Sequence, residues 1–281
     1  MNIKNNHIGI YEKAIPDQFN LIQKIEIAKQ SGFDFIELSI DESEEREKRL
    51  YWSKNEIEEL IKALINENFE IRSLCLSIHR KYPFGSKNEK TREKSYKIID
   101  KALELSKKLG IKNIQIAGYD VYYEKNDLQT KENFINGLKY AVKKAEKYNV
   151  MLSIEIMDTP FIGTITRCLE YINIINSPYL KIYPDLGNLS RWSENPELEL
   201  IKGMDKIVAI HLKDTKEGVF KNVPFGQGTV DFKKLLKTIN TQNYTGPFLI
   251  EMWADNSKIY TKEEIIIQLK ETKDWIKEKM E

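Results

Sequence analysis

Four side chains that can bind a metal ion or transfer a proton stand near the ends of four successive apolar runs. Glu155 lies in LSIEIMD, Asp185 in KIYPDLGN, His211 in VAIHLKD and Glu251 in FLIEMW. A carboxylate in such a run is rarely buried unless it is paired or binds a metal, because unpaired charge is costly to remove from water. Each residue alone is explained most simply as a salt-bridged or solvent-reaching strand end. Four in succession favour a shared site.

Three carboxylates and one imidazole are a suitable ligand set for one divalent cation. Such a set fits Mn²⁺, Mg²⁺, Co²⁺ or Zn²⁺ in an octahedral site that leaves positions open for a substrate. Thiolate ligands are not expected, because neither Cys75 nor Cys168 lies near these strand ends. Both cysteines are instead expected to be buried and reduced.

The elements that position these residues follow a regular alternation of short β-branched runs and longer amphipathic segments, which is typical of parallel βα units. The predicted strands are eight in number and cover 7–11, 33–40, 71–78, 111–118, 150–157, 180–187, 206–214 and 247–253. Without a linker or a break in composition, this pattern predicts a single-domain (β/α)₈ TIM barrel over 1–281, with an open doubly wound sheet as the alternative. No GxGxxG or GxxxxGK[ST] motif follows any strand, which weakens that alternative.

Local sequence signals predict where helices begin and end. Two segments rich in charged residues lie in predicted loops. Capping boxes are predicted at Ser53 with Glu56 and at Thr261 with Glu264. Left-handed C-terminal caps are expected at Gly32, Gly110 and Asn149. The acid-rich segment 41–49 and the Lys-rich segment 216–221 are expected to be solvated loops after the second and seventh strands.

Composition excludes several classes of function. The net charge of +1 and pI near 7.6 argue against a nucleic-acid-binding protein, which needs a basic surface. The apolar runs are too short to span a bilayer, so no membrane partner is expected. The first residues lack a long apolar stretch and a cleavage site, so a cytoplasmic location is expected.

Several sequence blocks along the whole chain carry a likeness to a known family. The chain resembles the L-xylulose 5-phosphate 3-epimerases, also called L-ribulose 5-phosphate 3-epimerases, of the xylose-isomerase-like barrel superfamily. The blocks are GIYEKAIP (9–16), GFDFIELSIDE (32–42), LCLSIHRKYPFGS (74–86), IQIAGYDVYY (114–123), IEIMDTP (154–160), YPDLGNLSRW (183–192), HLKDTKEGVFKNVPFGQGTVDF (211–232) and GPFLIEMW (246–253). The GYDVYY block and the long block after His211 are the most specific to this subgroup.

The resemblance implies an isomerase of pentose phosphate metabolism and L-ascorbate catabolism that interconverts L-xylulose 5-phosphate and L-ribulose 5-phosphate. It implies that Glu155, Asp185, His211 and Glu251 bind one divalent metal ion. It also implies that Glu155 and Glu251 are the opposed acid and base, acting through a metal-stabilised enediolate. A homodimer is expected because homo-oligomers are usual in such families.

Other activities remain open on the same barrel. The alternatives are an aldose–ketose sugar isomerase, a hexulose-phosphate epimerase and, more remotely, a non-catalytic sugar-phosphate binder. A related trinuclear-zinc endonuclease would need a His-rich cluster and a basic DNA-binding face, and this chain has three histidines and a net charge of +1.

A ketose phosphate needs a cationic or amide-rich pocket for its dianion. The candidate groups are Arg80, Lys81, Lys213, Lys221 and the backbone amides of 226–228. His79 follows an apolar strand, where a contact with a substrate hydroxyl and a hydrogen-bonded structural role are equally expected. Glu12 and Glu37, near the ends of the first two strands, are most simply explained by structural pairing.

Overall fold

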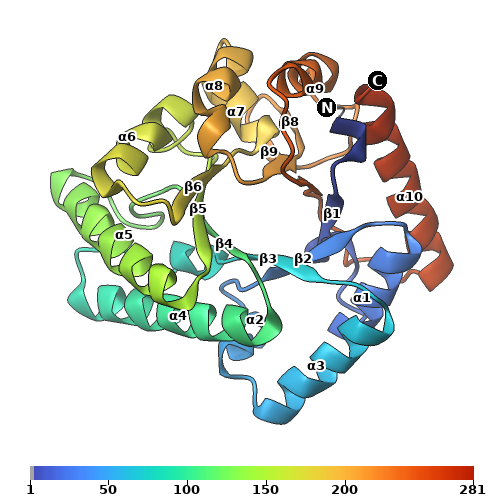
Figure 1. The fold of residues 1–281 in the computed structure, drawn as a ribbon, viewed down its shortest axis with the longest axis horizontal. Helices are drawn as coiled ribbons and strands as arrows, with labels where there is room; N and C mark the ends of the chain where they lie inside the picture. The colour runs from blue at the N-terminus through green and yellow to red at the C-terminus, as the bar shows by residue number, and fades with distance from the viewer. Residues whose placement is uncertain (1–2) are drawn as a thin grey trace.

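Eight parallel strands form a barrel in the computed structural model, which describes residues 3–281 (Figure 1). Their order is β6-β5-β4-β3-β2-β1-β10-β7, and isolated bridges between Ile182 and Ile207 and between Asp185 and His211 close the gap between β6 and β7. The predicted barrel is therefore confirmed, and the open sheet is wrong. The strands are β1 Ile8–Tyr11, β2 Phe35–Ser39, β3 Ile71–Cys75, β4 Asn113–Ala117, β5 Met151–Glu155, β6 Leu180–Tyr183, β7 Ile210–Leu212 and β10 Phe248–Ile250.

Helices surround the barrel and connect its strands (Figure 1). They are α1 Leu21–Gln30, α2 Glu44–Lys48, α3 Lys54–Asn66, α4 Glu89–Leu109, α5 Leu128–Tyr148, α6 Ile165–Ile175, α7 Leu186–Trp192, α8 Pro196–Gly203, α9 Phe232–Thr241 and α10 Lys262–Lys279. Both predicted capping boxes are present, and the three predicted caps have positive φ. Within residues 3–281, the helices include none that is long and apolar enough to cross a membrane.

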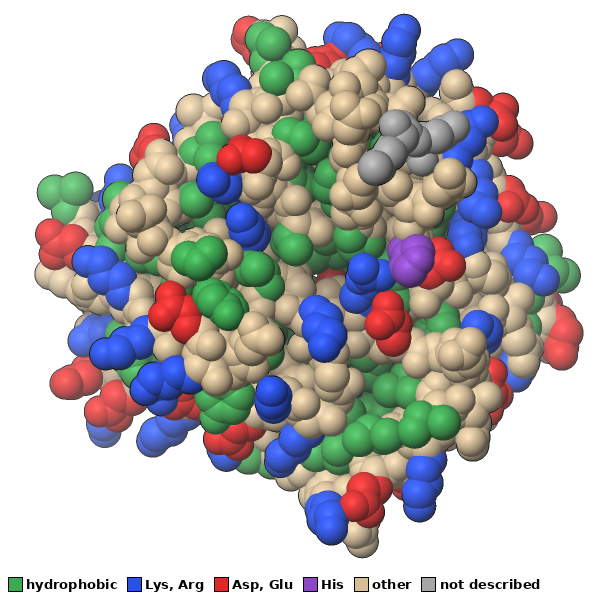
Figure 2. All heavy atoms as spheres, viewed as in Figure 1, with side chains coloured by type: hydrophobic (Ala, Val, Ile, Leu, Met, Phe, Trp, Pro, Cys, Tyr) green, Lys and Arg blue, Asp and Glu red, His purple; other side chains and the backbone are tan. Residues whose placement is uncertain are grey.

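The surface is mixed in charge, and the interior is largely apolar. Lys and Arg side chains are interspersed with Asp and Glu side chains over the face shown in Figure 2, as the near-zero net charge would suggest. Cys75 and Cys168 are both free and buried, as predicted.

The barrel has two apolar layers because successive strand residues point to opposite faces. Outward-facing residues such as Ile8 and Ile10 belong to the large core beneath the helices. A separate inner cluster consists of Tyr11, Phe35, Cys75, Tyr183, Ala209 and Leu249. A Cβ on Gly9 would lie 2.2 Å from the Phe35 ring, so this glycine makes room for the ring inside the barrel.

The same alternation directs polar residues into the barrel. Glu37 lies two residues after Phe35, and His211 lies two residues after Ala209, so both share the inner face. Parallel pairing extends this face to neighbouring strands, since Glu37 pairs with Ser73 and Ala117 pairs with Glu155. The strands therefore hold buried polar groups directly below the C-terminal end of the barrel.

The segment 216–221 is not a simple loop, in contrast to the sequence-based expectation. It contributes to an antiparallel hairpin of β8 Asp214–Lys216 and β9 Val219–Val223. Gly218 and Asn222 adopt positive φ in this hairpin, and its many charged residues conceal the strand pattern. The buried Asp214 carboxylate accepts hydrogen bonds from the amides of Gly226, Gly228 and Val230, which fixes the following loop.

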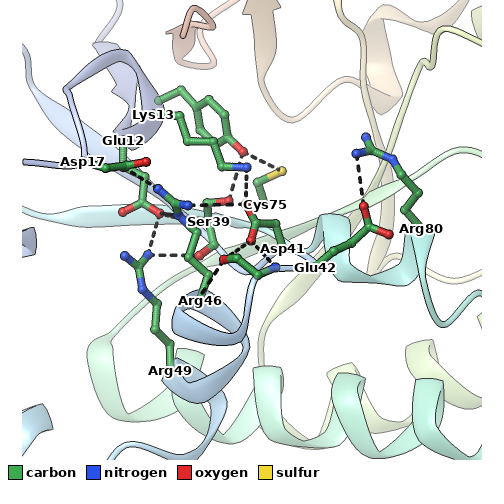
Figure 3. Close-up of polar contacts among 12 residues, drawn as sticks. Glu12, Lys13, Asp17, Ser39, Asp41, Glu42, Arg46, Arg49, Cys75 and Arg80 are labelled. Carbon is green, nitrogen blue, oxygen red and sulfur yellow. Dashed lines mark hydrogen bonds and ion pairs between the residues drawn. The ribbon is translucent and has the colours of Figure 1, made fainter. Parts of the chain in front are cut away.

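The segment 41–49 is also more ordered than a solvated loop. It contains α2 and two buried arginines, Arg46 and Arg49. Their side chains point toward Glu12 and Asp17, which follow β1 (Figure 3). Arg49 donates a hydrogen bond to the fully buried Glu12, and Arg46 donates to Asp17 at 2.7 Å. These pairs confirm the structural role expected of Glu12, and they join the loops that follow β1 and β2.

His79 lies in a 3₁₀ turn, Ser77–Arg80, that follows β3 and packs against α4. Its Nε2 is 3.3 Å from the carbonyl oxygen of Ser95, and its ring centroid is 4.4 Å from that of Phe84. Burial lowers the pKa of His79 to about 4. The imidazole is therefore neutral in the folded protein at neutral pH, and its Nε2–H donates to Ser95.

This burial makes stability depend on pH. The unfolded His79 has a pKa of about 6.5, so the unfolded chain binds the extra proton between that value and the folded pKa of about 4. The free energy of unfolding should thus fall as the pH decreases, with His79 contributing about 2 kcal/mol of loss between pH 7 and pH 5.

The variant H79Q keeps an N–H donor but does not titrate. Urea unfolding of wild type and H79Q at both pH values should show a smaller pH-dependent loss in the variant. Equal losses would contradict this assignment.

Candidate active site

The structure brings Glu155, Asp185, His211 and Glu251 together at the C-terminal end of the barrel. Glu155 ends β5, Asp185 follows β6, His211 lies in β7 and Glu251 follows β10. All four are buried, and one ligand atom from each lies within 4.8 Å of the others. Residues separated by up to 96 positions in the sequence therefore form one cluster, because parallel strands place their carboxyl ends on the same rim.

Asp185 and Glu251 each present an oxygen that suits a cation. One Asp185 oxygen, Oδ1, accepts a hydrogen bond from the Asn188 amide at 2.7 Å, which caps α7. Asp185 Oδ2 and Glu251 Oε2 lie 3.0 Å and 3.3 Å from Lys213 Nζ. Both oxygens are buried and lie within ion-pair distance of this one ammonium group, but within residues 3–281 neither makes a hydrogen bond of good geometry. Their need for positive charge is the first sign that the cluster fits a metal ion.

His211 stands between the carboxylates of the cluster and one further carboxylate, that of Glu37. Its Nδ1 is 3.1 Å from Glu155 Oε1 and 3.7 Å from Glu251 Oε2, on the side of the cluster. Its Nε2 is 3.2 Å from Glu37 Oε1, on the opposite side. The other Glu155 oxygen accepts a hydrogen bond from Gln115 Nε2, which orients that carboxylate.

The electrostatics of the cluster show the cost of confining its carboxylates. Burial raises the pKa of Asp185 to about 8, and burial also raises the pKa of Glu155. Burial would raise the pKa of Glu251 as well, but Lys213 and His211 together hold it at about 2. Burial would lower the pKa of His211, yet Glu37 and Glu155 raise it. A divalent cation would compensate the same negative charge, so the donor set fits a metal ion.

A small cavity of about 50 Å³ lies beside this cluster, and both Glu155 and Glu251 line it. Its walls carry four basic side chains, contributed by different segments of the chain: Lys13, Arg80, Lys213 and Lys221. The Trp253 ring lies beneath two of them, with its centroid 5.9 Å from Lys213 Nζ and 5.6 Å from Lys221 Nζ. The cavity thus combines acidic groups at one end with cations around it.

The three residues predicted to contact substrate have different positions. Arg80 and Lys213 line the cavity, whereas His79 is not among its lining residues. The contacts of His79 with Ser95 and Phe84 correspond to the structural role that was the alternative to a substrate contact. His79 and Arg80 differ because the turn after β3 directs consecutive side chains to opposite sides. His79 points toward α4, and Arg80 points toward the cavity.

Sequence reasoning missed several residues of the site, among them Gln115 and Lys13. Gln115 stands in an apolar strand run, as Glu155 does, and that likeness was the available signal. Lys13 follows β1 without any distinguishing pattern, and it reaches the cavity because it is paired with Asp41 (Figure 3).

Comparison with known proteins places this architecture in a family. The model of the xylose isomerase-like TIM barrel matches residues 25–279. A Haemophilus influenzae protein, SgbU, provisionally named an L-ribulose-5-phosphate 3-epimerase, is 48% identical over 99% of this chain and 98% of its own length. The L-ribulose-5-phosphate 3-epimerase UlaE of Escherichia coli O157:H7 is 42% identical over 97% of this chain and 94% of its own length.

Among solved structures, the IOLI protein with a bound zinc atom has a TM-score of 0.80 and 18% sequence identity. The match covers 98% of this chain and 99% of that one, and at this identity it supports the fold alone. The chain belongs to the xylose isomerase-like TIM barrel family, in which it is an isomerase of the epimerase class related to the proteins named L-ribulose-5-phosphate 3-epimerase.

Proposed function

We propose that this enzyme interconverts L-ribulose 5-phosphate and L-xylulose 5-phosphate by removing and returning the proton at C3. The observation that carries the proposal is the placement of Glu155 and Glu251. They come from β5 and β10, which are not neighbours in the barrel, yet they line the same cavity beside one cluster of metal-binding side chains. The identity to relatives named for this substrate adds support.

Glu155, Asp185, His211 and Glu251 would hold one divalent ion, chosen from Mn²⁺, Mg²⁺, Co²⁺ and Zn²⁺. When bound, such an ion supplies Lewis acidity to the ketose carbonyl and lowers the cost of the negative charge that develops beside C3. In our proposal, Asp185 and His211 serve mainly as ligands. Asp185 is suited to this because its other oxygen is fixed at the start of α7.

The two glutamates would move the proton. One carboxylate removes the C3 proton, and the other, protonated, delivers a proton to the opposite face of the planar enediolate. The roles exchange in the reverse reaction. Gln115 holds Glu155 by one oxygen, and Lys213 lies 3.3 Å from Glu251, so each carboxylate has a neighbour that fixes its orientation.

The basic side chains around the cavity suit a phosphate group. Arg80 lies with its guanidinium 4.9 Å from the centre of the Tyr122 ring and 3.8 Å from Glu42, at the edge of the cavity (Figure 3). Lys221 approaches from the β8–β9 hairpin. A dianion is stabilised by such charge-assisted contacts, so we assign the phosphate to this end of the cavity.

The position of isotope exchange separates the proposed epimerase from an aldose–ketose isomerase. In deuterated water, L-ribulose 5-phosphate should gain deuterium at C3 and yield L-xylulose 5-phosphate, as followed by NMR. Deuterium at C1 with an aldose product would instead identify the isomerase. Parallel assays with hexulose phosphates test the third candidate, and tight binding without any exchange would indicate a sugar-phosphate binder.

The acid–base assignment predicts the effect of two substitutions. E155Q and E251Q keep the shape of the side chain but lose the carboxylate, so each should lower kcat by at least about 100-fold. E199Q serves as the matched control, since Glu199 is a buried carboxylate that binds Thr166 on α6, away from the cavity. Near-normal turnover by both E155Q and E251Q would rule out this pair.

The phosphate assignment predicts a loss that depends on the substrate. R80M should lower kcat/KM for L-ribulose 5-phosphate by about 10- to 100-fold, because a hydrogen bond to a charged group contributes about 1.5–3 kcal/mol. Turnover of unphosphorylated L-ribulose should change much less. The control R72M replaces an arginine that contacts His7 at the other end of the barrel. Equal losses for both sugars in R80M would contradict a phosphate contact.

A further inference from the structure

A fifth buried acidic side chain lies behind the metal-binding cluster. Glu37 is on β2, is fully buried and does not line the cavity. Its Oε1 is 3.2 Å from His211 Nε2. Its Oε2 accepts hydrogen bonds from the Ser73 hydroxyl at 2.5 Å and from the Tyr183 hydroxyl at 3.2 Å. Strands β2, β3, β6 and β7 therefore meet at this one carboxylate.

The surroundings of Glu37 differ from those of an ordinary buried ion pair. Glu12 pairs with two arginines, whereas the only basic side chain within ion-pair distance of Glu37, among residues 3–281, is His211. Two hydroxyl donors already use Oε2, and Oε1 faces the imidazole. The arrangement thus presents one strong acceptor to one ring nitrogen.

A hydrogen bond to one imidazole nitrogen determines what the other can do. A neutral imidazole carries its proton on one nitrogen and keeps a lone pair on the other. A carboxylate accepts but does not donate, so Glu37 favours a proton on Nε2. Glu155 would likewise accept from Nδ1, and a cation bound beside Glu155 and Glu251 would take the place of that proton. The lone pair then lies on Nδ1, which faces Glu155 and Glu251 at 3.1 Å and 3.7 Å.

We propose that Glu37 is a positioning residue that keeps the proton on His211 Nε2, so that Nδ1 is the nitrogen that binds the cation. The Tyr183 ring supports this orientation, since its centroid lies 4.3 Å from that of His211 and its hydroxyl donates to the same carboxylate. The inference rests on the cation site of the proposed function. It adds which ring nitrogen is the ligand and which residue selects it.

The state of the ring can be observed directly in the wild-type protein. The chain has three histidines, so ¹⁵N-labelled imidazole groups give few NMR signals to assign. With Zn²⁺ bound, His211 should show a protonated Nε2 and a metal-bound Nδ1. A protonated Nδ1 with zinc on Nε2 would overturn the proposal without any variant.

Metal affinity provides the second readout. Competition with a chromophoric chelator should give a Zn²⁺ Kd that is about 10- to 100-fold weaker in E37L than in wild type, as is typical when a partner of a metal-binding histidine is lost. E37Q retains an acceptor oxygen and should lose less affinity. The control E199Q, which removes a buried carboxylate remote from His211, should bind as wild type does.

The outcomes separate the two proposals. If wild type binds no Zn²⁺, the cation site of the proposed function fails, and this inference fails with it. If wild type binds Zn²⁺ but E37L binds within about twofold of it, only the role of Glu37 is refuted. Should E37L fail to fold, the loss of affinity in E37Q and the wild-type tautomer still decide the question.

Discussion

The structure depends on the compensation of negative charge inside the barrel. Glu155, Asp185 and Glu251 are buried close together, where both desolvation and mutual repulsion oppose ionisation. Lys213 and His211 offset part of this cost through contacts of about 3 Å. Stability alone does not explain this arrangement, because apolar residues of similar size often stabilise a fold as well as a buried ion pair does. The presence of these charges inside the barrel is best explained by a chemical role.

The stability that supports such a site comes from another layer of the molecule. The apolar residues that face outward from the strands pack under the surrounding helices and form the large core. The inward positions are then free to carry polar side chains, with a small apolar cluster that includes Phe35 and Leu249. Alternation along each strand thus separates the residues that hold the barrel together from those that form the site.

Charge pairing also shapes the loops at the rim. Arg46 and Arg49 connect the segment after β2 to Glu12 after β1, and Asp41 pairs with Lys13 (Figure 3). Buried arginine–carboxylate pairs are demanding in geometry, so they order these loops more strictly than apolar contacts would. The result is that Lys13 reaches the cavity from a segment that has no regular strand or α-helix of its own.

The barrel and the four-residue cluster at its rim could be predicted from the amino-acid sequence alone. The alternation of apolar strands with amphipathic helices is a local property, and so are capping boxes such as Ser53 with Glu56. Chemistry-bearing residues at strand ends could be selected because parallel strands of a barrel end on one rim. These features do not depend on distant contacts, so they could be read from the chain.

Which polar residues face one another depends on how the barrel closes and could not be predicted from sequence. Glu37 and His211 are 174 positions apart, and no local pattern indicates that they share a hydrogen bond. The same holds for Arg49 with Glu12 and for the direction of His79, which depends on how the turn after β3 packs against α4. Such pairings follow from barrel register and closure, which a linear pattern of hydrophobicity does not specify.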